Sequence, residues 1–324
     1  MEGPNGTNKI ADWQLRQRQA MPLDLKVELS LRRIRDWCDH WDDMVYVAFS
    51  GGLDSTVLLH LARQVLPDCP AVFHDTGLEF PEIRDFVKTV DTVTWTKPRM
   101  TFKQVLEKHG YPVVSKRISQ YVEEARNTKS DKLRRLRMDG IKPDGTKYTN
   151  GMIPDKWKYL VDAPFDISGK CCDVFKKWPA EDYEKESGRK AFVGTRVEEG
   201  MQRELSYLQH GCNGYDMARP KSTPLSFWMH TDIIQYIKDN GLPYSKVYDM
   251  GHTRTGCMFC MLGCHLETKN RFQLMEESHP KLHDYCLNKL GLKDILEYIG
   301  VNPYNTQLEL FNDDDDDKNK LTDN

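Results

Sequence analysis

The sequence predicts an α/β protein, in which a doubly wound parallel sheet is followed by a helical, cysteine-bearing C-terminal part. Two observations carry this prediction. Short apolar runs alternate with helical patterns, which favours a parallel sheet, and a glycine-rich turn joins the first run to a helix. The apolar runs predict strands at 44–49, 71–74, 92–96 and 190–195. Helical spacing of apolar residues predicts helices at 24–41, 54–66, 81–90, 101–109, 115–138 and 173–187.

Composition limits the class of protein. The chain has 324 residues, 29% of them charged, and a mean hydropathy of −0.66. No apolar run approaches the ~18 residues that span a membrane, and the N-terminus MEGPNGTNKIADWQ lacks a signal-peptide pattern. We therefore expect a cytoplasmic protein with no membrane partner. Its nine cysteines are then more often ligands, catalysts or core residues than disulfides.

A glycine-rich turn follows the first predicted strand. It reads Ser50-Gly51-Gly52-Leu53-Asp54-Ser55 and leads directly into a helix. Unpaired N–H groups and the positive end of the helix dipole make such a turn an anion site. The glycines let the backbone approach phosphate, and Asp54 is placed to hold Mg²⁺. A tight structural turn is the alternative interpretation of the glycines alone.

This turn resembles the SGGxDS pyrophosphate loop of the ATP pyrophosphatases, which cleave ATP between the α and β phosphates. The stretch FHDTGLEFPEI at 73–83 resembles the DTG-x-x-FPET segment of the phosphoadenosine phosphosulfate (PAPS) reductase family. Stretches at 110–116, 194–203 and 224–248 extend the similarity over about 44–290. The resemblance implies the Rossmann-like adenine nucleotide α-hydrolase fold.

The resemblance also implies the roles of individual residues. It places nucleotide binding at Ser50, Gly51, Gly52, Asp54, Ser55, Asp75, Thr76 and Gly77. It assigns catalytic roles at the anionic groups to Asp54, Lys116, Arg196 and Arg203. The chain departs from the family at Glu199-Gly200, where members often have Glu-Ser, so the resemblance assigns no role to Gly200.

The cysteines form a second pattern. Cys171 and Cys172 are adjacent, and Cys257 and Cys260 form a CxxC. Four thiolates suit a 4Fe-4S cluster or zinc, and buried core thiols are the remaining interpretation. The CC-plus-CxxC pattern resembles the 4Fe-4S signature of adenylyl-sulfate reductases. Cys264 follows closely and is an alternative ligand.

The predicted organisation has four parts: an N-terminal helical segment (1–43), a nucleotide-binding α/β domain (44–196), a helical part with the CxxC (197–311) and a disordered acidic tail (312–324). A basic arm at 115–160 holds twelve Lys and Arg against six Asp and Glu. A solvated helix face and a nucleic-acid or polyanionic partner both explain it.

Three functions are compatible with these patterns. The intact SGGxDS loop favours an ATP pyrophosphatase that adenylates a target and couples to sulfur transfer. A thioredoxin-dependent adenylyl-sulfate or PAPS reductase is the alternative, although 287–324 contains no cysteine to serve as its tail nucleophile. A non-catalytic nucleotide-binding iron–sulfur module is the third. The expected ligands are ATP or a sulfonucleotide, with Mg²⁺. A thioredoxin-like protein or a cysteine desulfurase is the expected donor, and self-association into a homo-oligomer stays open.

Overall fold

The computed structural model describes residues 10–253 and 255–305, and its central element is a six-stranded sheet with the order β3-β2-β1-β4-β6-β5. Every neighbouring pair of strands is parallel except β5 with β6. The strands are β1 (Val45–Ala48), β2 (Ala71–His74), β3 (Val93–Thr96), β4 (Lys190–Val193), β5 (Asn213–Gly214) and β6 (Lys221–Ser222). The chain leaves β1 first toward β2 and β3, and later returns to its other side at β4. This is the doubly wound arrangement, and it confirms the predicted fold class.

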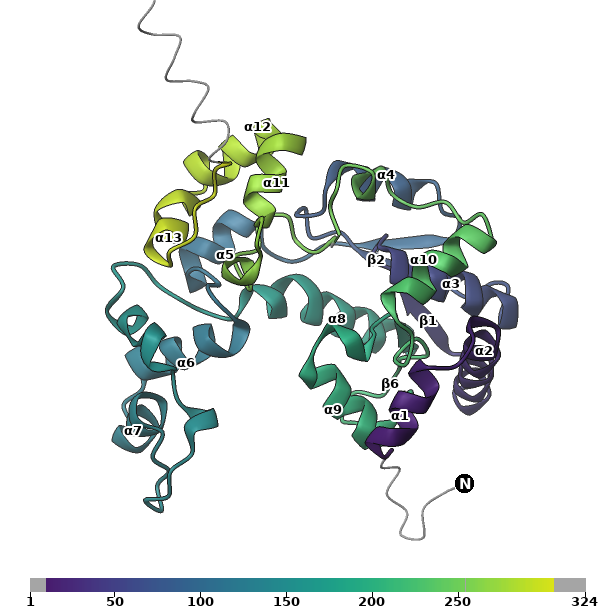
Figure 1. Cartoon of the computed structure of the whole chain (residues 1–324), viewed down its shortest axis with the longest axis horizontal. Helices are drawn as coiled ribbons and strands as arrows, with labels where there is room; N and C mark the ends of the chain where they lie inside the picture. Colours follow the sequence, from purple (N-terminus) through teal and green to yellow (C-terminus); the bar gives the residue numbers. More distant parts are fainter. Residues whose placement is uncertain (1–9, 254, 306–324) are drawn as a thin grey trace, which may run out of the picture. The chain divides into compact units, whose positions relative to one another are not determined.

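Helices cover both faces of this sheet (Figure 1). On one face Tyr46, Val72 and Ala191 form a buried cluster against Tyr183 of α8 (Trp178–Ser187). Side chains alternate along a strand, so the valines on either side of Tyr46 point to the opposite face. There α3 (Leu53–Val65) contacts β1 and β4, and α2 (Leu23–His40) and α10 (His230–Asp239) pack on α3.

The described residues divide into two compact units. The sheet unit comprises 10–99, 175–249, 253 and 255, and the cysteine unit comprises 100–174, 250–252 and 256–305. The sheet unit also contains α1 (Asp12–Gln19), α4 (Pro81–Lys88), α9 (Met201–His210), η4 (Val197–Glu199) and η5 (Lys246–Tyr248). The cysteine unit contains α5 (Phe102–His109), α6 (Lys116–Asn127), α7 (Asp131–Asp139), η1 (Thr149–Gly151), η2 (Asp155–Asp162), η6 (Cys264–Leu266), α11 (Arg271–Ser278), α12 (Pro280–Asp284), η7 (Tyr285–Lys289) and α13 (Leu292–Tyr298). A π-helix, η3 (Asp173–Lys177), leads into α8.

This division does not follow the boundary expected near residue 196. Residues 197–249 group with the sheet because they supply β5, β6 and α10, whereas 100–174 group with the C-terminal helices. The expected N-terminal helical segment contains α1 and α2, and both belong to the sheet unit. The expected disordered tail, 312–324, lies outside the described residues.

The predicted secondary structure is correct for the four longer strands and for most helices. The helix expected over 115–138 is wrong in one respect, because it is interrupted at 128–130. Thr128 is extended, and the Ser130 hydroxyl accepts the Leu133 N–H (3.3 Å) as the N-cap of a new helix, α7. None of the helices in the described ranges combines the length and the apolar character that crossing a bilayer requires.

His74 at the end of β2 is a largely buried imidazole. Its Nδ1 lies 2.6 Å from Thr96 Oγ1, and its Nε2 has no hydrogen-bond partner in the part of the chain that the structure describes. Burial and, to a smaller extent, the positive charge of Arg219 lower the pKa of His74 from 6.5 to about 4, against the opposing effect of Glu184. The fold therefore stabilises the neutral imidazole.

We expect the stability of the fold to decrease as the pH falls through the ordinary titration range of histidine. The unfolded chain takes up the His74 proton near pH 6.5, whereas the folded chain resists protonation until about pH 4. The free energy of unfolding should fall by about 2 kcal/mol between pH 7 and pH 5 on account of this residue. Urea unfolding at both pH values would measure it. His74→Gln should remove this part of the decrease, and an unchanged pH dependence in that variant would contradict the prediction.

Candidate functional site

The loop Ser50–Ser55 joins β1 to α3 at the point where the strand order reverses, the usual ligand position in such sheets. Its own polar atoms brace it. The Ser50 and Ser55 hydroxyl oxygens are 3.1 Å apart, and Ser55 Oγ donates to the Gly52 carbonyl (2.9 Å). The Thr56 hydroxyl donates to the same carbonyl (3.0 Å). The loop is therefore held in shape without a ligand.

Gly51 has a left-handed φ of +72°, which favours glycine. A Cβ at Gly51 would lie 2.8 Å from Val87 Cγ2 and 2.9 Å from Ile83 Cγ2, both on α4. Glycine is thus required here because α4 packs on the loop. This packing requirement adds to the two roles predicted for the glycines, the approach of phosphate and a tight turn.

The first turn of α3 presents free backbone donors. The N–H groups of Asp54 and Ser55 make no hydrogen bond within the described part of the chain. A Cβ at Gly194, just after β4, would come within 3.1 Å of the Ser55 nitrogen, so glycine keeps this turn open. Two N–H groups at the positive end of a 13-residue helix are donors of the kind that bind anions, and their contact with a nucleotide stays a prediction.

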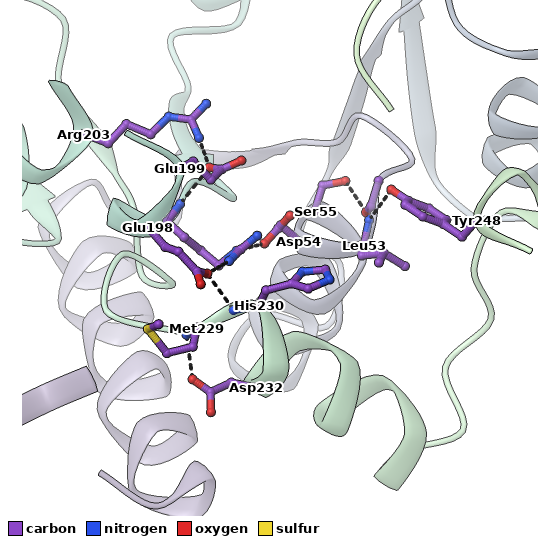
Figure 2. Close-up of polar contacts among 12 residues, drawn as sticks. Leu53, Asp54, Ser55, Glu198, Glu199, Arg203, Met229, His230, Asp232 and Tyr248 are labelled. Atoms are coloured by element: carbon purple, nitrogen blue, oxygen red, sulfur yellow. Dashed lines mark hydrogen bonds and ion pairs between the residues drawn. The ribbon is translucent and has the colours of Figure 1, made fainter. Parts of the chain in front are cut away.

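Two hydroxyl groups that the sequence analysis missed complete this turn. The Leu53 N–H donates to the Tyr248 hydroxyl (3.1 Å), which lies 2.9 Å from Thr255 Oγ1 (Figure 2). A Cβ at Gly52 would lie 2.9 Å from that threonine oxygen. Tyr248 ends the stretch 224–248 on which the resemblance rests, but no spacing or charge pattern marks it as a site residue.

Asp54 belongs to a charged network that starts from a buried arginine. The Arg196 guanidinium, 7% exposed, donates through Nε to Asp54 and forms an ion pair with Glu198. The backbone N–H of Arg196 donates to Glu199 Oε2 (3.1 Å), and Glu199 forms an ion pair with Arg203. Figure 2 shows these carboxylates beside the first turn of α3. A buried guanidinium is stable only when carboxylates or other acceptors surround it.

The same network fixes the start of α10. Glu198 also accepts the His230 N–H (2.7 Å), and Asp232 accepts the Met229 N–H (2.6 Å). The Lys26 ammonium, almost fully buried, lies 2.5 Å from Asp232 Oδ2. Strand β4, helix α3 and helix α10 are therefore connected by ion pairs and hydrogen bonds at one place.

The Asp75-Thr76-Gly77 loop after β2 is closed by its own contacts. Asp75, 4% exposed, accepts from the Gly77 N–H (3.1 Å) and the Arg84 guanidinium (2.9 Å). Thr76 donates to Glu79 from both its N–H (3.1 Å) and its hydroxyl (2.6 Å). Burial raises the pKa of Glu79. These side chains shape the loop, and their contact with a nucleotide stays a prediction.

Lys116, the fourth residue to which the resemblance assigns catalysis, lies in the cysteine unit. Its ammonium is 2.6 Å from Asp173 Oδ1, next to Cys172 in the chain. The structure thus joins Asp54, Arg196 and Arg203 in one network and gives Lys116 a different partner.

The backbone brings the two cysteine motifs to one short segment, 111–114. Ile167, four residues before Cys171, forms a parallel bridge with Tyr111. Leu262, two residues after Cys260, forms one with Val114. The Cys260 N–H donates to the Cys257 carbonyl (3.1 Å), so the CxxC is itself a turn. Each cysteine motif therefore lies close in the chain to a residue that pairs with the segment 111–114.

The donor set suits a metal centre in chemistry and in backbone placement. All nine cysteines are free thiols, and four thiols are the ligands of iron–sulfur and zinc centres. As the described side chains stand, no group of three or more His, Cys, Asp or Glu residues among them is arranged to hold a metal ion. Ligation would require the four sulfur atoms to close on a common centre.

The cysteines outside the motifs are buried and unreactive. Burial raises the pKa of five thiols, to about 11 or about 12: Cys38, Cys69, Cys212, Cys264 and Cys286. Two of them also donate to carbonyls, Cys264 to Met261 (3.1 Å) and Cys286 to His283 (3.2 Å). Such thiols are protonated at neutral pH and are poor nucleophiles.

Comparison with known proteins gives the following matches. The model of the phosphoadenosine phosphosulfate reductase domain matches residues 44–262. An uncharacterized protein of Methanocaldococcus jannaschii is 26% identical over 289 residues, covering 87% of this chain and 56% of the relative. The chain therefore spans little more than half the length of that relative. The adenosine 5'-phosphosulfate reductase of Geobacillus kaustophilus is 28% identical over 253 residues, covering 76% of this chain and 86% of the relative.

Two solved structures are also similar. One is the PAPS reductase of Candida auris in a phosphate complex, with a TM-score of 0.43 at 18% identity, over 78% of this chain and 98% of that chain. The other is the tRNA thiolase NcsA of Methanococcus maripaludis with its 4Fe-4S cluster, with a TM-score of 0.35 at 15% identity, over 86% and 82%.

The packing of α4 on the loop predicts that Gly51 and Gly77 tolerate a methyl group differently. Both have left-handed φ angles, +72° and +73°, but a Cβ at Gly77 would meet nothing within 4 Å. Gly77→Ala should therefore cost only the backbone strain, about 1 kcal/mol. Gly51→Ala adds overpacking against α4 and should cost about 2 to 4 kcal/mol.

Urea unfolding of the two variants without any ligand would measure the difference. Equal losses would show that α4 yields to the added methyl group, and that the packing argument is wrong.

Proposed function

Because the chain belongs to the phosphoadenosine phosphosulfate reductase domain family, we propose that it is an enzyme of sulfur metabolism that binds ATP at Ser50–Ser55 and adenylates an acceptor. In the proposed step an acceptor atom attacks the α phosphorus of ATP. The bond from that phosphorus to the bridging oxygen breaks, and pyrophosphate leaves with the electron pair. A sulfur nucleophile supplied by a donor then attacks the acceptor carbon that carries the adenylate, the bond from that carbon to the adenylate oxygen breaks, and AMP leaves with the electron pair.

The proposal rests mainly on the first turn of α3, where two backbone N–H groups make no hydrogen bond within the described part of the chain. The serine loop before this turn is held in shape by its own hydrogen bonds. The N–H groups of Asp54 and Ser55 suit the oxygens of a leaving pyrophosphate. The loop keeps the complete SGGxDS pattern, whereas a sulfonucleotide has no pyrophosphate for it to hold. ATP therefore explains the loop better than adenylyl sulfate or PAPS does.

The negative charges of Asp54 and of a bound phosphate repel each other, so we expect the nucleotide to bind together with a cation. Asp54 is the carboxylate that would hold Mg²⁺, an ion that binds through one or two carboxylates plus phosphate oxygens. Its present partner is Arg196, which lies where it can pair with a phosphate oxygen once Asp54 is engaged elsewhere. Arg203 pairs with Glu199 and adds a second positive charge to the same network.

A thioredoxin-dependent reductase of adenylyl sulfate or PAPS is the second candidate. It is favoured by the relatives named adenosine 5'-phosphosulfate reductase. Such chemistry needs a thiolate that can reach the substrate within about 3–3.5 Å. Cys212 and Cys264 are buried thiols with a raised pKa, and 287–324 contains no cysteine. These facts favour adenylation.

We further propose that Cys171, Cys172, Cys257 and Cys260 hold a 4Fe-4S cluster, with zinc as the alternative. When bound, such a cluster ties its ligand segments together and offers iron for electron or sulfide transfer. The chain's own contribution is the pairing of 111–114 with both motif segments.

The nucleotide proposal predicts that Mg²⁺–ATP binds more tightly than AMP, since the loop contacts fall on the β and γ phosphates. Asp54→Asn should reduce that preference by at least about tenfold, because one Mg²⁺ ligand is lost. Asp85→Asn is the matched control, since Asp85 is an exposed carboxylate of the same unit paired with Lys88. Calorimetric titration of the three proteins would measure the preference. Equal affinity of the parent protein for ATP and AMP would refute pyrophosphate binding.

The same protein, incubated with adenylyl sulfate or PAPS, should carry no sulfite-sized adduct in the mass spectrum. An adduct on Cys212 or Cys264 that thioredoxin releases would establish the reductase instead.

The cluster proposal predicts brown protein after anaerobic purification. A serine at any one of the four motif positions should bleach the absorbance and lower the melting temperature, because the ligands join distant segments. Cys286→Ser is the control, because this buried thiol lies outside both motifs and donates a hydrogen bond to the His283 carbonyl. Colourless protein with one stoichiometric zinc would replace iron but keep the ligand set, and colour that survives all four substitutions would refute the set.

A further inference from the structure

The basic arm exposes cations that have no carboxylate partner. We define its outer face by seven exposed side chains that form no ion pair with any carboxylate among the described residues. They are Lys129, Lys132, Arg134, Arg135, Lys142, Lys147 and Lys156. The acidic residues nearby are fewer: Asp131, Asp139 and Asp144 are exposed carboxylates with no Lys or Arg partner among the described residues, and Asp155 pairs with Lys158. The outer face is therefore positively charged at neutral pH.

Arg137 is a cation of the arm that faces inward and holds its parts together. Arg137 donates to Glu124 (2.6 Å) and to the Gly151 carbonyl (2.8 Å), and its guanidinium lies 3.8 Å from the centre of the Tyr121 ring. These contacts join α6, α7 and the turn after it, and α6 and α7 pack side by side (Figure 1). The arm is thus a folded element of the cysteine unit, and the seven cations of its outer face are exposed on that frame.

A short hairpin extends this face beyond α7. Ile141 pairs with Lys147 in an antiparallel bridge, and the Lys142 N–H donates to the Thr146 carbonyl (2.9 Å). Gly145 makes the turn with a left-handed φ of +85°. The hairpin carries Lys142 on its first strand and Lys147 on its second, and the Lys142 ammonium lies 4.8 Å from the centre of the Tyr148 ring.

We propose that the outer face binds a nucleic acid through its phosphate backbone. Unpaired lysine and arginine side chains spread over a helix and a hairpin match a line of phosphates, whose binding releases counterions. The core of a protein–protein interface is apolar and depleted of charge. Between residues 128 and 150 of the described structure, one large apolar side chain is exposed, Tyr148 at 43%. This face therefore fits a nucleic acid better than a protein partner. An exposed aromatic ring among cations suits an unpaired base.

This inference concerns the cysteine unit and does not require ATP or adenylation. Its test therefore uses the full protein without nucleotide. Fluorescence anisotropy would measure binding of about 30-nucleotide single-stranded RNA, single-stranded DNA and duplex DNA over a range of salt concentrations. The affinity should fall with salt, with a slope of about −0.7 to −0.9 per phosphate contact. The tightest of the three probes identifies the form of nucleic acid.

The deciding variant combines Lys132→Gln, Lys142→Gln and Lys147→Gln. It should lose at least about tenfold in affinity near physiological salt, and its salt slope should be shallower by about 2 to 3, because three phosphate contacts are removed. Replacing the same three lysines by arginine should retain binding, since charge is kept. That second variant separates charge from folding.

The matched control removes three exposed, unpaired lysines of the same unit outside the arm, with Lys108→Gln, Lys281→Gln and Lys289→Gln. It should bind as the parent does. Equal weakening of both triple variants, or no weakening of the arm variant, would overturn the proposal. Binding to vesicles with 30% phosphatidylserine or to polyglutamate, in the absence of nucleic-acid binding, would overturn it as well.

Discussion

The contact on which the site depends is the ion pair between Asp54 and the buried Arg196 guanidinium. It joins the end of β4 to the first turn of α3, where Gly194 lets the two backbones approach. A buried guanidinium that loses its carboxylate leaves an uncompensated charge, which costs far more than the pair contributes. The guanidinium connects the first turn of α3, through Asp54, with the 3-10 turn η4 and the start of α10, through Glu198.

The pair also decides what can bind beside it. Asp54 places a negative charge at the N-terminus of α3, where the helix dipole favours it. An incoming phosphate would be repelled by that carboxylate unless a cation lies between them. Arg196 or a divalent ion can fill this role, which makes anion and cation binding at the loop interdependent. If the loop binds phosphate as proposed, this accounts for an aspartate beside its N–H donors.

Much of the fold was predictable because the signals are local. The strands β1, β2 and β4 are short, largely buried apolar runs, and the glycine turn between β1 and α3 is visible in six residues. The strands β5 and β6 were missed because two residues each are too few to show alternation. The interruption between α6 and α7 depends on one N-cap serine inside a continuous basic pattern.

The site was predictable only where one stretch of chain contains it. The open N–H groups lie inside the loop, but the Tyr248 hydroxyl that accepts the Leu53 N–H is 195 residues away. The Lys116–Asp173 pair spans 57 residues and joins two polar side chains that no periodicity connects. The tight contact of Gly51 with α4 depends on side-chain packing, and a motif gives no information about it.

The nine cysteines divide into four within the two motifs and five outside them. Five cysteines lie in apolar surroundings that hold their protons, and none of these belongs to the CC or CxxC motif. The motif cysteines lie close in the chain to two of the points where it passes from one unit to the other, 174–175 and 255–256. Within the cysteine unit, both motifs also lie next to residues that pair with the segment 111–114. A centre bound by both motifs would therefore act first on the stability of the cysteine unit, and any chemistry at the centre would be added to that structural role.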